Sequence, residues 1–129
     1  MKGQESKMAD IKTITIDGID VALKCTGATS VLYRREFGKD LFVEFNKYAK
    51  NVNDNEDGAI PEGAIDMLEE AAYIMAKQAN PSEKRDFVAW LDQFNMMALV
   101  QDIAKVAEII VEDRLTLDEA KKKSDQAQE

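Results

Sequence analysis

The dipeptide Asp17-Gly18 constrains the fold most strongly, because it lies between two segments in which apolar and polar residues alternate. Asp-Gly supplies the two positive φ angles of a type I′ turn, so residues 11–25 are predicted to form a β-hairpin. A turn at this position pairs Ile16 with Ile19 and gathers the apolar side chains on one face. These side chains are Ile14, Ile16, Ile19, Val21 and Leu23. Two strands alone are only marginally stable in water, so other elements must cover this face.

Helical periodicity begins after the hairpin, where two helices are predicted first. Thr29 or Ser30 is predicted to cap the first helix, because a hydroxyl oxygen accepts a hydrogen bond from a free amide at a helix start. Gly38 is predicted to end this helix in the left-handed conformation. Asp40 is then predicted to cap a second helix that extends to about residue 50.

Three further helices are predicted after a polar loop at 51–59. Pro61 is predicted to lie in the first turn of the third helix, and Asn80-Pro81-Ser82-Glu83 has the cap, proline and acidic residue of a fourth helix start. A fifth helix is predicted over about 95–115. The apolar stripes of these helices are Ile65, Leu68, Ala72, Met75 and Ala79, then Phe87, Trp90, Leu91 and Phe94, then Met96, Leu99, Ile103, Val106 and Ile110.

The predicted fold is therefore mainly α (α+β), with the N-terminal hairpin packed on a small bundle of about five helices. One helical domain is expected over 11–115, because neither an internal repeat nor a change of composition divides it. Residues 1–10 are expected to form a flexible N-terminus. Residues 116–129 are expected to form a polar, disordered tail, since they contain too few apolar residues to become ordered.

Composition argues against several functional classes. The 129 residues include no His and a single Cys, and the net charge is −8. Without His, the sequence lacks the side chain that usually acts as a general base near neutral pH, and it lacks the usual nitrogen ligand of zinc. Cys25 is interpreted as a small buried apolar side chain. We expect no enzymatic activity, no cofactor and no metal site. Binding to nucleic acid or to a membrane is not expected either, and the polar N-terminus lacks the pattern of a secretory signal.

The acidic residues are unevenly distributed along the chain. No Lys or Arg lies between Lys50 and Lys77, whereas seven acidic residues do, so one side of the molecule is expected to be strongly negative. A calcium loop at 53–64 is not favoured, because Asn53 and Ala64 stand where such a loop needs Asp and Glu. The acidic residues, including Glu69 and Glu70, are interpreted as a solvated helix face. The seven are Asp54, Glu56, Asp57, Glu62, Asp66, Glu69 and Glu70.

Two further groups of side chains are candidates for partner contacts. Arg34, Arg35 and Lys39 form one basic cluster, which is predicted to pair locally with Asp40 or Glu36 or with a partner. An apolar group at the fourth and fifth helices is assigned mostly to the core, but its two consecutive Met residues favour a groove for a partner helix. The candidate partner-binding residues are Trp90, Phe94, Met96, Met97, Leu99 and Ile103.

Several short motifs follow one another in a defined order. After the hairpin and Ala28-Thr29 comes the pattern Tyr-Arg-x-x-Phe-Gly-x-Asp, and Ala72 to Lys77 and Trp90-Leu91 follow it. This order, over about 11–115, resembles the tail assembly chaperone family of long-tailed, non-contractile phages and prophages of Gram-positive bacteria. The residues of the family motif are Tyr33, Arg34, Phe37, Gly38 and Asp40.

The resemblance implies a protein of the host bacterial cytoplasm that binds the tape measure protein, keeps it soluble and promotes polymerisation of tail tube subunits. Such a chaperone leaves before the particle is mature, and relatives are also made in a longer, frameshifted form. The run Lys121-Lys122-Lys123 is compatible with a slippery codon sequence. The family motif has both a fold-building and an interface interpretation. Self-association is also compatible with the apolar stripes.

The alternative hypothesis is an acidic phage-encoded inhibitor or nucleic-acid mimic, which would use the surface from Asp54 to Glu70 to bind a basic host protein. Such binding weakens steeply as salt rises, whereas binding in an apolar groove weakens little. An enzyme is the third class and has the least support, because Cys25 has no His to activate it.

Overall fold

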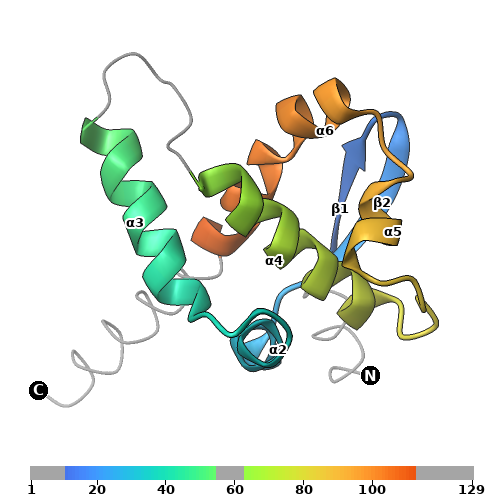
Figure 1. The fold of residues 1–129 in the computed structure, drawn as a ribbon, viewed down its shortest axis with the longest axis horizontal. Helices are drawn as coiled ribbons and strands as arrows, with labels where there is room; N and C mark the ends of the chain where they lie inside the picture. The colour runs from blue at the N-terminus through green and yellow to red at the C-terminus, as the bar shows by residue number, and fades with distance from the viewer. Residues whose placement is uncertain (1–10, 55–62, 113–129) are drawn as a thin grey trace, which may run out of the picture.

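The computed structural model describes residues 11–54 and 63–112 (Figure 1). A β-hairpin is followed by helices, which confirms the predicted mainly helical α+β fold. The elements are β1 (Ile11–Ile16), β2 (Ile19–Lys24), α2 (Gly27–Phe37), α3 (Leu41–Asp54), α4 (Ala64–Ala79), α5 (Phe87–Leu91) and α6 (Met96–Asp102), and residues 104–112 are also helical. The expected flexible N-terminus, most of the polar and calcium-like loop, and the C-terminal tail with its lysine run lie outside the described residues.

The hairpin has the predicted register. β1 and β2 are antiparallel and pair Ile16 with Ile19. The turn residues Asp17 and Gly18 have φ angles of 53° and 74°, as a type I′ turn requires. The apolar face is turned toward the core, because Ile16, Val21 and Leu23 are buried and Ile14 is half-buried. Ile19, beside the turn, remains exposed.

The first helix begins earlier than predicted. Thr26, not Thr29 or Ser30, is its N-cap, and the Thr26 Oγ1 atom accepts a hydrogen bond from the Ala28 amide at 3.2 Å. Thr29 completes a capping box, since its Oγ1 accepts from the Thr26 amide at 2.9 Å. The Gln78 side chain of α4 donates to Thr26 Oγ1 at 3.0 Å and accepts from Thr29 Oγ1 at 2.7 Å. A residue remote in sequence therefore stabilises the start of this helix.

The connection between α2 and α3 is formed as predicted. Gly38 has a φ of 71°, in the left-handed region, and its amide donates to the Arg34 carbonyl at 2.8 Å. Asp40 Oδ1 accepts from the Val43 amide at 3.1 Å and so caps α3. α3 extends to Asp54, past the predicted end, because residues 51–54 include neither Gly nor Pro to stop it.

Helix α4 is the centre of the fold. In Figure 1 it crosses the middle of the molecule, with α3 on one side and the hairpin and α5 on the other. It contacts β2, α2, α3 and α5, so it is buried on most of its circumference, beyond the predicted stripe. The helix begins at Ala64, after Gly63, so the prediction that Pro61 lies in its first turn is wrong. Pro61 itself lies outside the described residues.

The predicted start of the fourth helix at Asn80-Pro81-Ser82-Glu83 is also wrong. Asn80 Oδ1 accepts from the Ser82 amide at 3.2 Å and forms a local turn. The Glu83 carboxylate does not cap a helix. It accepts hydrogen bonds from Arg85 Nε at 2.8 Å and from Arg85 Nη2 at 2.6 Å. α5 begins at Phe87, because Asp86 Oδ1 caps it by accepting from the Ala89 amide at 2.8 Å.

The predicted fifth helix is divided. Asn95 caps α6, with its Oδ1 accepting from the Met97 amide at 3.0 Å, but the helix ends at Asp102. Ile103 is its C-cap, and a new helical segment starts at residue 104. The Val106 amide bonds the Ile103 carbonyl, a tight i to i+3 contact, at the break. The apolar stripe stays buried across this break at Leu99, Ile103, Val106 and Ile110.

The hairpin turn is fastened to this late part of the chain. The Asp17 amide donates to Asp102 Oδ2 at 3.1 Å, and Asp17 Oδ2 accepts from the Asn95 amide at 2.8 Å. Lys105 Nζ donates to the Thr15 carbonyl at 3.2 Å. These bonds join residues 78 to 90 positions apart, so the N-terminal hairpin and the α6 region hold each other in place.

Candidate functional site

Tyr33, the first residue of the family motif, anchors α2 on α4. Its side chain is buried, and its hydroxyl donates to Glu70 Oε1 at 2.8 Å. Lys39 Nζ bonds both oxygens of the same carboxylate, at 3.0 Å and 3.2 Å. Burial raises the pKa of the Tyr33 hydroxyl, and the hydrogen bond to Glu70 raises it further. The phenol is therefore a neutral donor to a carboxylate that Lys39 neutralises.

The other motif residues also shape this corner of the fold. The Phe37 ring lies 5.3 Å from the Tyr33 ring and 5.2 Å from the Phe87 ring, centroid to centroid, which links α2 to α5. Gly38 and Asp40 form the helix end and the helix cap described above. Arg34 Nη2 lies 3.6 Å from Asp40 Oδ2, an exposed ion pair that adds little to stability. The geometry thus gives the motif a fold-building role.

The basic cluster pairs only partly as predicted. Arg34 does pair with Asp40, but Lys39 pairs with Glu70 from α4 and not with its sequence neighbours. The interpretation of Glu70 as a solvated surface carboxylate is wrong, because its side chain is only 12% exposed. Glu69 is half-buried, whereas Asp66 is exposed.

Burial raises the pKa of the Glu69 carboxyl, and the charges of Asp66 and Glu70 add to this effect. A carboxyl group whose pKa is raised on folding stabilises the folded state at pH values below its unfolded-state pKa. This stabilisation is lost as the pH rises through its folded-state pKa. We therefore expect Glu69→Gln to increase the unfolding free energy at pH 7 by about 0.5 kcal/mol. Urea titrations at pH 7 and pH 3.5 should show this gain only at pH 7. A gain of equal size at both values would contradict the electrostatic explanation.

The six candidate partner-binding residues divide into two groups. Trp90 is 2% exposed and lies 5.8 Å from the Tyr73 ring and 5.3 Å from the Phe94 ring. Phe94, Leu99 and Ile103 are buried as well, so these four side chains are not available to a partner. Met96 and Met97, at the start of α6, are 72% and 62% exposed.

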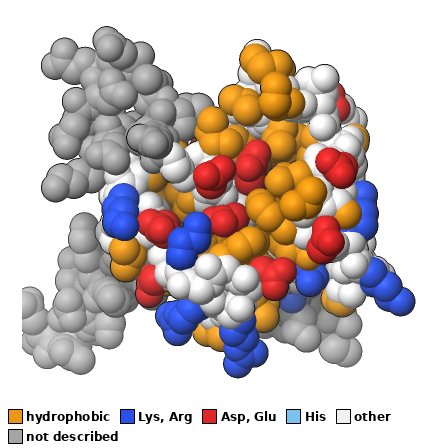
Figure 2. All heavy atoms as spheres, in the orientation of Figure 1, with side chains coloured by type: hydrophobic (Ala, Val, Ile, Leu, Met, Phe, Trp, Pro, Cys, Tyr) orange, Lys and Arg blue, Asp and Glu red, His pale blue; other side chains and the backbone are white. Residues whose placement is uncertain are grey.

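Several exposed apolar side chains are not among the candidates from the sequence. Phe42 and Val43 lie half exposed on α3, and Val88 on α5 is 65% exposed. Figure 2 shows apolar side chains at the surface near α6, at the top of the view, and between patches of acidic side chains elsewhere. Phe42 and Val43 directly follow the apolar Leu41, which indicates an α3 with more apolar side chains than one buried face needs.

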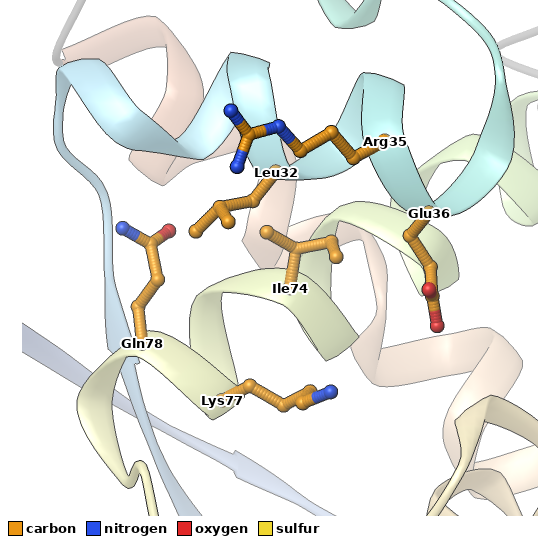
Figure 3. A pocket seen from close by; sticks show the side chains of 6 residues that line it. All are labelled: Leu32, Arg35, Glu36, Ile74, Lys77 and Gln78. Atoms are coloured by element: carbon orange, nitrogen blue, oxygen red, sulfur yellow. The ribbon is translucent and has the colours of Figure 1, made fainter.

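Three surface cavities differ in character. A small one of about 250 Å³ lies between α2 and α4, where Leu32 and Ile74 face each other (Figure 3). Its rim carries Arg35, Glu36, Lys77 and Gln78, and Gln78 is already bonded to the two capping threonines. A second, of about 280 Å³, lies beside β2 and Trp90. The largest, about 600 Å³, is a groove between α3 and residues 104–112.

Among the described residues, no group of three or more His, Cys, Asp and Glu side chains is placed to hold a metal ion. Cys25 is half-buried and packs against the core. Within residues 11–54 and 63–112, no helix has the length and apolar character needed to cross a membrane.

No family model, no curated protein and no solved structure gives a significant match to this chain. The family resemblance therefore depends on the motif residues and their order alone.

Proposed function

We propose that this chain is a tail assembly chaperone of a phage or prophage of Gram-positive bacteria. It acts in the host cytoplasm without catalysis, binds the tape measure protein and keeps it in solution. It also promotes polymerisation of the tail tube protein, directly or through a frameshifted longer form. The observation that carries the proposal is the order of a hairpin, Ala28-Thr29 and then the motif Tyr33, Arg34, Phe37, Gly38 and Asp40.

The surface of the molecule supports this function. Large apolar side chains remain exposed as neighbouring pairs, Phe42 and Val43 on α3 and Met96 and Met97 on α6, and grouped apolar side chains at a surface favour binding to another polypeptide. The net charge of −8 keeps copies of the chain apart while these apolar groups are exposed. A helical partner with apolar stripes would bind to these apolar side chains, and the net charge of this chain would keep the complex in solution.

The test is coexpression with the tape measure protein encoded in the same genome. We expect that protein to be recovered in a soluble complex with this chain, and to aggregate when it is expressed alone. The control is coexpression with an unrelated small acidic protein, which should not rescue it. Aggregation of the tape measure protein beside a correctly folded chain would refute the proposal.

Salt distinguishes this function from the acidic mimic. A complex held by apolar contacts should survive 1 M salt, because the Debye length there falls to about 3 Å and only charge pairing is screened. Glu70 also supports apolar binding over mimicry, since its carboxylate is turned inward and neutralised by Lys39. Complete release of the partner in 1 M salt would favour the mimic.

A further inference from the structure

The groove between α3 and residues 104–112 is the largest of the three cavities described above, and most of its lining is apolar. α3 supplies Phe45, Tyr48 and Ala49, and the opposite wall has Ala104, Ala107 and Val111. Phe45 is buried at the base, and its ring centroid lies 5.7 Å from that of Tyr48. The alanines on the opposite wall keep the groove open, because they carry no side chain beyond Cβ.

The lining of this groove fits a helix better than a small polar ligand. Sites for small ligands have several polar groups that converge on the ligand. Here the charged groups, Glu108 and Glu112, belong to one wall, and the rest of the lining is apolar or aromatic. That wall is helical over residues 104–112, a rise of about 12 Å, so it matches about two turns of a partner helix.

The charge at the rim indicates which helix fits. Glu108 is exposed and has no hydrogen-bond or ion-pair partner among the described residues. Glu112 lies 4.0 Å from Lys12 in a long ion pair, and its side chain is 63% exposed. A second copy of this chain, with its own net charge of −8, would be repelled, whereas a basic helix would be attracted.

We propose that this groove binds an amphipathic helix of the tape measure protein, and that Lys or Arg residues flank the apolar stripe of that helix. The inference rests on the function proposed above. The apolar side chains at i, i+3 or i+4, and i+7 of the helix contact Phe45, Tyr48 and Val111. Its basic residues pair with the exposed carboxylate of Glu108.

The apolar wall is tested with Val111→Glu, because Val111 is 40% exposed and its replacement should not prevent folding. The carboxylate would have to be buried against the bound helix, so we expect the complex with full-length tape measure protein to dissociate at least about tenfold faster. The dissociation rate is measured by exchange with labelled wild-type chain. Val88→Glu is the matched control, since Val88 lies on α5, is more exposed and does not line the groove; its rate should stay within about twofold of wild type.

The rim is tested with Glu108→Lys. This exposed substitution should accelerate dissociation about threefold to tenfold at low salt, and the effect should shrink as salt rises. Glu36→Lys is its control, because Glu36 is also exposed and makes the same change of charge on α2. Circular dichroism melting curves confirm that each variant is folded.

Each outcome decides the question. Wild-type exchange rates for both Val111→Glu and Glu108→Lys would overturn the groove assignment and leave the chaperone function standing. Faster exchange only for Val88→Glu or Glu36→Lys would also overturn it. A wild-type dimer that Val111→Glu converts to a monomer would assign the groove to a second copy. If the wild-type chain forms no complex with the tape measure protein, both proposals fail.

Discussion

Replacing Trp90 with alanine is expected to lower the unfolding free energy by about 3–5 kcal/mol. The indole is 2% exposed and packs between the Tyr73 and Phe94 rings, so its removal leaves a cavity that α4 and α5 cannot easily close. Domains of this size are typically stable by about 5–15 kcal/mol, so the loss would be a large part of the total. Urea denaturation followed by circular dichroism measures the change.

The control for Trp90→Ala is Met97→Ala. Met97 belongs to the same group of apolar candidates, but it is 62% exposed and should change stability by less than about 0.5 kcal/mol. Equal stability of Trp90→Ala and wild type would contradict the packing described for α4 and α5. The pair of variants therefore separates a core residue from a surface residue that the sequence pattern treats alike.

Replacing Glu70 with alanine is expected to cost about 2–3 kcal/mol. The variant leaves the buried Tyr33 hydroxyl without its acceptor and Lys39 without the carboxylate that it bonds at 3.0 Å. The cost should stay below that of breaking a fully buried ion pair, because the Lys39 side chain is 41% exposed. Denaturant titration at pH 7 gives the value, and Glu36→Ala, an exposed carboxylate on α2, should be nearly neutral.

A double-mutant cycle tests whether Tyr33 and Glu70 act together. Once Tyr33→Phe has removed the hydroxyl, Glu70→Ala should cost less than it does in the wild-type chain. Additive effects of the two substitutions would show that the hydrogen bond between them contributes nothing to stability. The cycle also asks whether the first residue of the family motif stabilises the fold.

The parts of the fold that depend on neighbouring residues could be predicted from the sequence. The turn at Asp17-Gly18, the left-handed Gly38 and the cap at Asp40 are each set by two to four adjacent residues. The first helix was misplaced because Gln78, remote in the sequence, fixes Thr26 and Thr29. The break at Ile103 was also missed, because neither glycine nor proline marks it.

The candidate site could be predicted only in outline. An apolar stripe identifies Trp90 and Met96 equally well, and only the position of α4 and the aromatic side chains decides which of them is buried. The role of Glu70 depends on Tyr33, 37 residues earlier, so its neighbours in the sequence give no sign of it. The groove could not be predicted either, because it requires α3 and residues 104–112 to lie on opposite sides of a space.

The bonds between Asp17 and the region of Asn95 and Asp102 bear on how the protein is made. During synthesis the hairpin emerges first, but the groups that fasten its turn are added about 80 residues later. Contacts of such long separation slow folding, because a large loop of chain must close before they form. The turn of the nascent hairpin therefore stays unfastened until residues 95–102 have left the ribosome, whereas α4, which packs against β2, emerges earlier.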